Sequence, residues 1–193
     1  IKFSNQIFMN FEKEYLNIQK YHNKISVVGL PQKIIANNLN NIKKNNNSFL
    51  NFLVFAGSQG SLDILVIFKN LIKSFKKISN IKKIYFTIQA PLIKHKEIEN
   101  LLNKNGYDFK IQNFFNNFDQ ILEQTDIALC RSGAGTINDL INYKIPAIIC
   151  PLPSAKDNHQ YENAKMLSMI KCAIIIDKNK IKNNEIMLFI DKL

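Results

Sequence analysis

The sequence predicts an α/β fold, in which a parallel β-sheet carries helices on both faces. Short apolar runs alternate with longer segments whose apolar residues recur three and four positions apart, which is the pattern of repeated βα units. The 193 residues, 46% of them hydrophobic, are enough for one well-buried domain and too few for two full-sized ones. We therefore expect one core.

The expected strands are apolar runs separated by helical segments. In chain order they are KISVVG at 24–29, FLVFAG at 52–57, KIYFTIQ at 83–89, FKIQNF at 109–114, DIALC at 126–130, PAIIC at 146–150 and AIIID at 173–177. Helical spacing is clearest after the second strand, at Ile64, Leu65, Phe68, Leu71, Ile72 and Phe75. Residues 33–48, rich in Asn and Lys, are typical of a surface connection between the first two strands. Together these elements predict a Rossmann-like sheet.

Bulk properties narrow the classes of function. No run of about eighteen apolar residues could span a membrane and no signal peptide opens the chain, so we expect a soluble, cytosolic domain. Cys130, Cys150 and Cys172 lack metal-ligand spacing and are expected to be buried small hydrophobes, and no other residues form a metal cluster. The net charge of +11 admits an anionic membrane surface as a partner. Lysine is spread along the chain without interleaved aromatic residues, which disfavours nucleic acid.

Ligands of open parallel sheets bind where loops leave the carboxyl ends of the strands. The first such loop contains Gly57, Ser58 and Gln59, between a strand and a helix. Glycine lets backbone amides approach a ligand closely, and a helix N-terminus attracts phosphate. The loop lacks the lysine of the Walker motif and the third glycine of GxGxxG, which disfavours kinases, ATPases and dinucleotide oxidoreductases. A diphosphate site and a tight connection without a ligand both remain open.

A second glycine-bearing loop, RSGAGT at 131–136, follows DIALC and opens a helix. Two such loops in one sheet strengthen the prediction of an anion site. Asp139 lies one turn into the helix, where a carboxylate can accept hydrogen bonds from both hydroxyls of a ribose. The alternative is a carboxylate that only complements the helix dipole.

The third loop, PLPSAKDNHQ at 151–160, leaves its strand through two prolines and ends in a polar cluster at the start of a helix. Small hydrogen-bonding side chains such as Gln160 suit the hydroxyls of a sugar. No carboxylate is obviously placed to orient His159 as a general base, so we expect it to bind a ligand and not to transfer a proton. His22 and His95 have polar surroundings and are expected to be surface residues without a role.

Taken together, AGSQGS, CRSGAGTINDL and IPAIICPLPSAKDNHQYENAKML closely resemble, in order and separation, the donor-binding domain of the MurG family. The resemblance runs from about Ile25 to about Ile176. Members of that family transfer N-acetylglucosamine from UDP-GlcNAc to undecaprenyl-linked muramylpentapeptide, which converts lipid I to lipid II in peptidoglycan synthesis. It implies the C-terminal half of a GT-B architecture, an inverting glycosyltransferase without a cofactor, and a peripheral location at the cytoplasmic face of the bacterial inner membrane. Roles in cell-wall biogenesis, cell shape and cell division are implied as well.

The resemblance also implies which residues bind UDP-GlcNAc. It assigns Ser58 to the diphosphate, the Phe115 backbone to the uracil, and Gln160, with His159, to the sugar. The residues expected around the nucleotide are Ala134, Gly135, Thr136, Ile137, Asn138 and Asp139. Lys33, Gly57 and Gln59 complete the expected site.

Three departures from the family pattern bear on this assignment. After the first strand the family has Gly-Asn-Pro-x-Arg, whereas this chain reads GLPQK and ends the motif at Lys33, which keeps the charge and loses the bidentate fork. Asp139 stands where glutamate is usual, and Ala56 stands where glycine is usual. The shorter carboxylate arm could cost roughly 1–2 kcal/mol of binding if one hydrogen bond is lost.

The acceptor-binding half of this family, with its candidate base, precedes the part seen here. We therefore expect residues 1–24 to be the tail of that domain or an interdomain segment. Residues 25–193 are expected to form a UDP-GlcNAc-binding domain, truncated at its C-terminal end, that binds without catalysing. Two alternatives remain: a non-catalytic donor-binding subunit of a split glycosyltransferase that needs a membrane-bound partner, as in the dolichol pathway, and an inactive, degraded copy.

Overall fold

The computed structural model describes residues 3–9, 19–29, 49–56, 62–75, 83–153, 155, 158–177 and 183–192. The chain divides into two compact units, Ile1–Asn40 and Asn41–Leu193. In the first unit, β1 (Ile7–Met9) pairs in parallel with β2 (Ile25–Val27), and a 3-10 segment, η1 (Gln19–Lys24), leads into β2. The surface connection expected over 33–48 lies outside the described residues.

The units divide between residues 40 and 41, and the domain boundary expected between residues 24 and 25 stays a prediction. The strand expected at 24–29 does form, but it belongs to a separate two-stranded sheet with β1 and not to the main sheet. The Val28 amide extends this pairing by donating to the Met9 carbonyl at 2.9 Å. The assignment of residues 1–24 to an acceptor domain stays a prediction.

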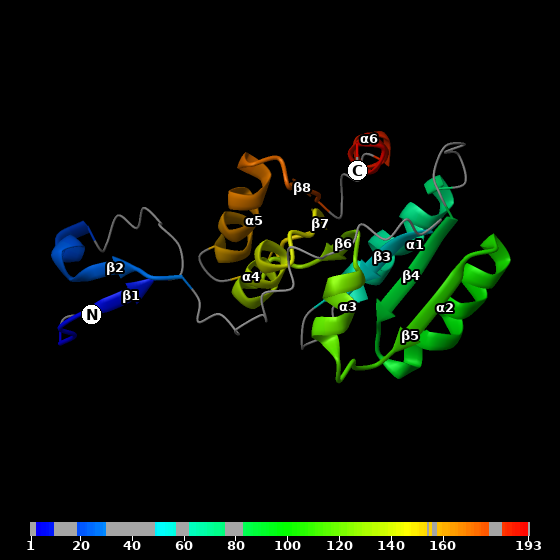
Figure 1. Cartoon of the computed structure of the whole chain (residues 1–193), viewed down its shortest axis with the longest axis horizontal. Coiled ribbons are helices and arrows are strands. Elements are labelled where there is room, and N and C mark those ends of the chain that lie inside the picture. The colour runs from blue at the N-terminus through cyan, green and yellow to red at the C-terminus, as the bar shows by residue number, and fades with distance from the viewer. Residues whose placement is uncertain are drawn as a thin grey trace. The chain divides into compact units, whose positions relative to one another are not determined.

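The second unit is built on a six-stranded parallel sheet of order β5-β4-β3-β6-β7-β8 (Figure 1). Its strands are β3 (Phe49–Val54), β4 (Lys83–Gln89), β5 (Asp108–Gln112), β6 (Ile127–Cys130), β7 (Ala147–Ile149) and β8 (Ala173–Ile175). Every pairing is parallel, so the predicted α/β class is confirmed. The chain winds outward from β3 to β5, then returns past β3 to place β6 on its other side.

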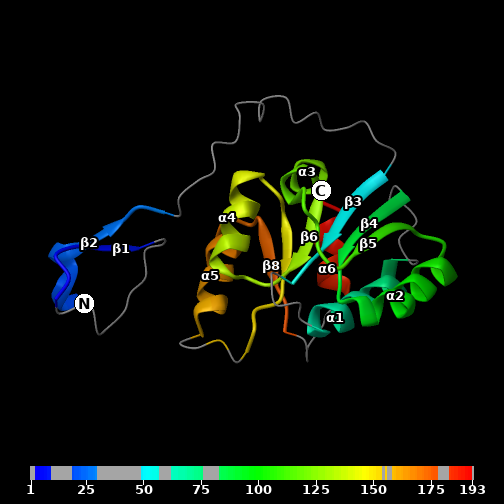
Figure 2. The ribbon, with the colours of Figure 1, turned by 90° about the horizontal axis from the view of Figure 1, so that it is seen from below.

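Helices cover both faces of this sheet. They are α1 (Leu62–Phe75), α2 (Leu92–Asn105), α3 (Phe118–Gln124), α4 (Ala134–Asn142), α5 (His159–Met169) and α6 (Asn183–Ile190). Figure 2 shows α1, α2 and α6 on one face, and α3, α4 and α5 on the other; α1 contacts both α2 and α6, and α4 contacts α5. None of the described helices is both long and apolar enough to cross a membrane.

Sequence patterning explains which faces are buried. Along β4, Ile84, Phe86 and Ile88 alternate with less buried residues, and all four residues of β6 are buried because helices cover that strand on both sides. α2 ends at Gly106, whose φ of 74° is a left-handed conformation that costs glycine little.

The core beneath α1 is aromatic. Phe86 of β4 lies 5.4 Å from Phe52, 5.2 Å from Phe68 and 5.2 Å from Tyr107, measured between ring centroids. Phe86, Phe52 and Phe68 have no exposed surface. These rings join two strands and a helix into one cluster, which matches the spacing predicted for α1.

One expectation about the cysteines is wrong. Cys130 and Cys150 are buried, as expected, but Cys172 is exposed, because it lies between the end of α5 and the start of β8 and outside the buried stretch of that strand.

Candidate functional site

The loops after β3, β5, β6 and β7 leave the same edge of the sheet, because all these strands run parallel. β6 and β7 are neighbours in this sheet, and Cys130 pairs with Ile149 at their ends. The loops that begin at Arg131 and at Cys150 therefore start side by side. A parallel α/β sheet binds its ligands at this carboxyl edge.

Four of the expected site residues cannot be located at this edge. Lys33, Gly57, Ser58 and Gln59 lie outside the described residues. Their assignment to the site, including that of Ser58 to the diphosphate, stays a prediction.

The start of α4 has the features of an anion site. Gly133 caps the helix with φ −59° and ψ 150°, and no side chain caps it. The first in-helix bond from this end is the 3.0 Å bond from the Ile137 amide to the Gly133 carbonyl, so the amides of Ala134, Gly135 and Thr136 face outward without a helical acceptor. Gly135 is exposed, and a Cβ built there would meet nothing within 4 Å. Unpaired amides and the positive end of the helix dipole suit a phosphate.

The other predicted site residues of α4 differ in how exposed their side chains are. Ile137 is fully buried, so only its backbone could contact a ligand. Asn138 and Asp139 are half-buried on the first two turns. Asp139 lies close enough to Tyr143 to contribute, after burial and the charges of Asp119 and Glu123, to raising the pKa of Tyr143 to about 12.

Phe115 stands in the loop between β5 and α3. Its side chain is 3% exposed, and the Lys110 ammonium lies 5.7 Å from the centroid of its ring. The loop borders a hollow of about 760 Å³, whose lining also includes Leu92 and His95 at the start of α2 and Phe114, which is exposed. Because the ring is buried, any contact of Phe115 with a base at this edge would come from its backbone, as expected.

His95 is not the bare surface residue that its sequence context predicts. Its Nε2 lies 2.8 Å from the Ala90 carbonyl, which ties the first turn of α2 to the end of β4. His22 is exposed, as predicted. A second hollow, of about 480 Å³, lies at the amino ends of β3, β4 and β5, away from the carboxyl edge.

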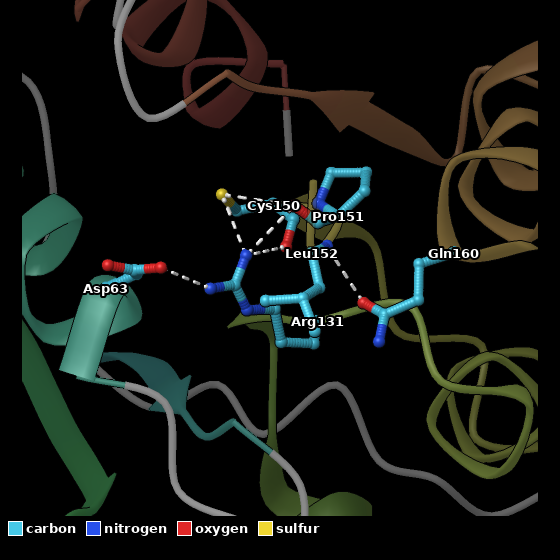
Figure 3. Close-up of polar contacts among 6 residues, drawn as sticks. All are labelled: Asp63, Arg131, Cys150, Pro151, Leu152 and Gln160. Atoms are coloured by element: carbon cyan, nitrogen blue, oxygen red, sulfur yellow. Dashed lines mark hydrogen bonds and ion pairs between the residues drawn. The ribbon is translucent and has the colours of Figure 1, made fainter. Parts of the chain in front are cut away.

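Gln160, in the first turn of α5, points back toward the loop that precedes it (Figure 3). Its Oε1 accepts a hydrogen bond of 3.0 Å from the Leu152 amide, which fixes the orientation of the carboxamide. Asn158, the N-cap residue immediately before α5, has a left-handed conformation with φ 52°. His159, beside Gln160, is exposed. The helix start is therefore held in place by its own loop.

Arg131 lies at the centre of this edge and was not predicted as a site residue. It is 5% exposed, and its Nη1 donates to the carbonyl oxygens of Cys150, at 2.8 Å, and Pro151, at 2.9 Å. Its Nη2 donates to Oδ2 of Asp63 in the first turn of α1 at 3.0 Å (Figure 3). One guanidinium thus joins the end of β6, the end of β7 and the start of α1.

Two further buried polar groups lie next to Arg131. Asn163 of α5 is 4% exposed and donates from Nδ2 to the Ser132 carbonyl at 3.0 Å. The Ser132 hydroxyl is fully buried and has no hydrogen-bond partner among the residues that the structure describes. Asn163 occurs at a buried helical position beside Ala164 and Leu167, and a polar residue within such an apolar pattern is the signal that could have identified it.

No metal site emerges at this edge. Within the described ranges, no three His, Cys, Asp or Glu side chains gather in a way that could hold a metal ion. What the edge offers is a helix N-terminus for an anion, hydrogen-bonding side chains, and a buried arginine that joins the loops.

Comparison with known families gives a match over most of the chain. The profile of the glycosyltransferase family 28 C-terminal domain matches residues 51–193. A protein of Rickettsia bellii (strain RML369-C), named UDP-N-acetylglucosamine--N-acetylmuramyl-(pentapeptide) pyrophosphoryl-undecaprenol N-acetylglucosamine transferase, is 31% identical over 193 residues. The match covers 94% of this chain and 54% of the relative. A protein of the same name from Rickettsia canadensis (strain McKiel) is 32% identical, with 92% and 52% covered. The chain spans about half the length of these curated relatives.

Solved structures agree on the fold. The crystal structure of Acinetobacter baumannii MurG superposes with a TM-score of 0.68 at 20% identity, over 80% of this chain and 44% of that one. The glycotransferase of kitacinnamycin superposes with a TM-score of 0.61 at 15% identity, over 89% of this chain and 41% of that one. Both likenesses support the arrangement of strands and helices seen here, that of one half of a GT-B glycosyltransferase.

Proposed function

This chain belongs to the glycosyltransferase family 28 C-terminal domain family, and on that premise we propose that it is the UDP-GlcNAc-binding half of a MurG-type N-acetylglucosaminyltransferase. The observation that carries the proposal is the uncapped N-terminus of α4 at the carboxyl edge of the sheet, with Asp139 within two turns of it and Gln160 at the start of a neighbouring helix. These features suit, in turn, a diphosphate, a ribose and a sugar.

In this proposal the donor lies along the carboxyl edge. The amides at 134–136 and residues 57–61 would bind the diphosphate, the Phe115 backbone the uracil, and Asp139 the ribose hydroxyls. Gln160, with His159 beside it, would bind the N-acetylglucosamine. Amides and helix dipoles stabilise the negative charge that develops on the departing UDP without requiring a metal. The domain therefore supplies leaving-group stabilisation and orientation of the sugar.

The rest of the reaction belongs to the full-length enzyme. We propose transfer with inversion to a lipid-linked muramylpentapeptide, which would make lipid II from lipid I at the cytoplasmic face of the inner membrane. The acceptor hydroxyl would be deprotonated by a group outside the described edge, as the resemblance to the MurG family implies. The curated relatives, whose matched part is about half of a longer chain, support this arrangement over a separate donor-binding subunit.

The test is calorimetric titration of the chain with UDP-GlcNAc, with UDP-glucose and ADP-ribose as controls. We expect selective binding of UDP-GlcNAc. Asp139→Ala should weaken it about tenfold, because about 1.4 kcal/mol corresponds to one or two lost hydrogen bonds. Ser58→Ala should also weaken it, because the proposal assigns the Ser58 side chain to the diphosphate. Both variants should keep the wild-type circular dichroism.

Asp108→Ala is the matched control, because it removes an exposed carboxylate at the amino end of β5, the opposite edge of the sheet. It should leave the affinity unchanged. Wild-type affinity in both Asp139→Ala and Ser58→Ala would contradict the site assignment, and a folded wild-type chain that binds no UDP-GlcNAc would contradict the function.

A further inference from the structure

We propose that Arg131 is a positioning residue, which holds the loop after β7 and the first turn of α1 in a fixed relation so that the sugar and the diphosphate of one donor are bound together. The inference rests on the proposed function for the identity of the donor. It rests on the described contacts for the positioning itself. Arg131 is not one of the residues that the sequence predicted for the binding site.

The contacts of the guanidinium point inward to the protein. Nη1 is engaged by the carbonyl oxygens of Cys150 and Pro151, and Nη2 by the Asp63 carboxylate (Figure 3). The Arg131 side chain is 6% exposed, whereas that of Asp63 is 37% exposed. A guanidinium with both terminal nitrogens bound to protein oxygens is suited to fixing backbone, and less to gripping a mobile phosphate.

A continuous series of contacts leads from this residue to the proposed sugar site. The Pro151 carbonyl, held by Arg131, belongs to the peptide unit whose amide is that of Leu152, and the Leu152 amide donates to Gln160 Oε1. Gln160 is the residue proposed to bind the sugar. Fixing the Pro151–Leu152 peptide from both sides therefore orients the Gln160 carboxamide.

A second contact leads to the proposed diphosphate site. Asp63 is the second residue of α1, and the α4 amides proposed to bind the diphosphate begin three residues after Arg131. The 3.0 Å ion pair between Asp63 and Arg131 therefore anchors the start of α1 to the end of β6. Arg131 is thus linked to the groups proposed to bind the sugar and to those proposed to bind the diphosphate, and small shifts between binding groups are costly for a ligand that must contact all of them.

The planar fork of arginine is what allows these contacts. Lysine carries the same charge on one nitrogen and cannot reach two carbonyl oxygens and a carboxylate on opposite sides at once. Arg131→Lys thus separates two roles. A residue that acts by charge alone keeps most of its effect as lysine, whereas a residue that acts by geometry loses it.

The first arm of the test compares UDP-GlcNAc with UDP by calorimetry in the wild type, Arg131→Lys and Arg131→Met. We expect the ratio of the two dissociation constants to shift about tenfold against UDP-GlcNAc in both variants, within the range of coupling through contiguous contacts. A loss of folded protein weakens both ligands by the same factor and cannot move the ratio. Lys69→Met is the matched control, because it removes a positive charge from the middle of α1, where Lys69 pairs with Glu97 of α2.

The second arm needs no ligand. Hydrogen exchange of the Leu152 amide should accelerate about tenfold or more in Arg131→Met and Arg131→Lys, because the peptide loses its anchor while core amides keep their protection. The same amide should exchange at the wild-type rate in Lys69→Met. This arm tests the positioning role even if the wild type binds neither ligand. Absence of binding in the wild type would overturn the proposed function and would leave the positioning role to be decided by the exchange rates.

Two results overturn the inference. One is unchanged exchange at Leu152 in Arg131→Met. The other is a wild-type affinity ratio in Arg131→Lys, which would assign Arg131 a purely electrostatic role. If Arg131→Met does not fold, the affinity ratio and the Leu152 exchange rate of Arg131→Lys decide between the two results.

Discussion

Two of the three cysteine thiols are buried in the core around the main sheet, and the third is exposed at the surface. Cys130 and Cys150 end neighbouring strands and are 0% and 1% exposed. Burial, and to a lesser extent the neighbouring Cys150, raises the pKa of the Cys130 thiol well above its usual range. Because the thiolate is the reactive form, Cys130 is inert for two reasons, access and protonation.

We therefore predict that one thiol per native chain reacts with a chromogenic disulfide reagent, and that all three react after unfolding. Cys172→Ser should abolish the native reaction and change the free energy of unfolding by less than about 0.5 kcal/mol, because the residue is exposed. Cys150→Ser serves as the control and should leave the native reaction intact. Rapid reaction of two thiols in the native protein would contradict this burial.

Among the helices, α3 and α4 are joined by a polar contact. The Tyr143 hydroxyl, at the end of α4, donates to Oδ1 of Asp119 in the first turn of α3 at 3.2 Å. Burial raises the pKa of Tyr143 to about 12, and the charges of Asp119, Glu123 and Asp139 add to the effect. The folded protein therefore keeps this hydroxyl protonated at a pH where the unfolded chain releases the proton.

This pKa gives a pH-dependent prediction for Tyr143→Phe. The raised pKa contributes stability that is fully present below about pH 10, the ordinary pKa of tyrosine, and is lost as the pH rises toward 12. Near neutral pH the variant should lose about 0.5–1.5 kcal/mol with the hydrogen bond. The difference from wild type should shrink between pH 10 and 12, as measured by urea unfolding at several pH values. A difference that grows with pH would contradict the assignment.

Local sequence patterns were enough to predict that most helices and strands exist. Where the predicted bounds were wrong, the reason is a contact between residues far apart in the sequence. KIYFTIQ predicted β4 to the residue, because a buried apolar strand is recognisable from its own sequence. β3, in contrast, starts at Phe49, before FLVFAG, because Phe49 and Leu50 pair with Lys83 and Ile84 of β4. The backbone amide and Nδ2 of Asn51 also donate to Oδ2 of Asp126, at 2.8 and 3.3 Å. Asp126 lies 75 residues away, and no local pattern reveals such a partner.

The site divides in the same way. Glycine-bearing turns predicted the helix N-terminus of α4, because glycine at a helix start is a local signal. The Arg131–Asp63 pair joins residues 68 positions apart, so neither residue is marked by its own segment. β2 was correctly predicted as a strand, but it was expected in the main sheet and instead pairs with β1. The reason is the same, since the partner of a strand is decided by the fold and not by the sequence of the strand itself.

At the scale of the whole molecule, stability depends on the aromatic cluster around Phe86. Its ring meets those of Phe52, Phe68, Phe75 and Tyr107, which come from a neighbouring strand, from α1, and from the residue before β5. When such a ring is truncated, the surrounding strands and helix cannot all move inward, so a cavity remains in the core.

Phe86→Ala should therefore cost about 3–5 kcal/mol of unfolding free energy, measured by urea denaturation with an unchanged denaturant slope. Phe114→Ala is the matched control, because Phe114 is 65% exposed, and should cost less than about 0.5 kcal/mol. A cost below about 1 kcal/mol for Phe86→Ala would contradict the central place of this ring.

The order of strands in the main sheet also has a consequence during synthesis. β3, β4 and β5 pair with one another and leave the ribosome first, whereas β6, the second partner of β3, is made only after α3. At about 5–20 residues per second, the stretch from the end of β5 to the end of β6 takes on the order of one to four seconds. For that time β3 is paired with β4 on one side only, and the edge at Phe52, Leu53 and Val54 that later pairs with β6 lacks its partner. The interval between β5 and β6 is thus when the growing chain is most exposed to mispairing and to capture by chaperones.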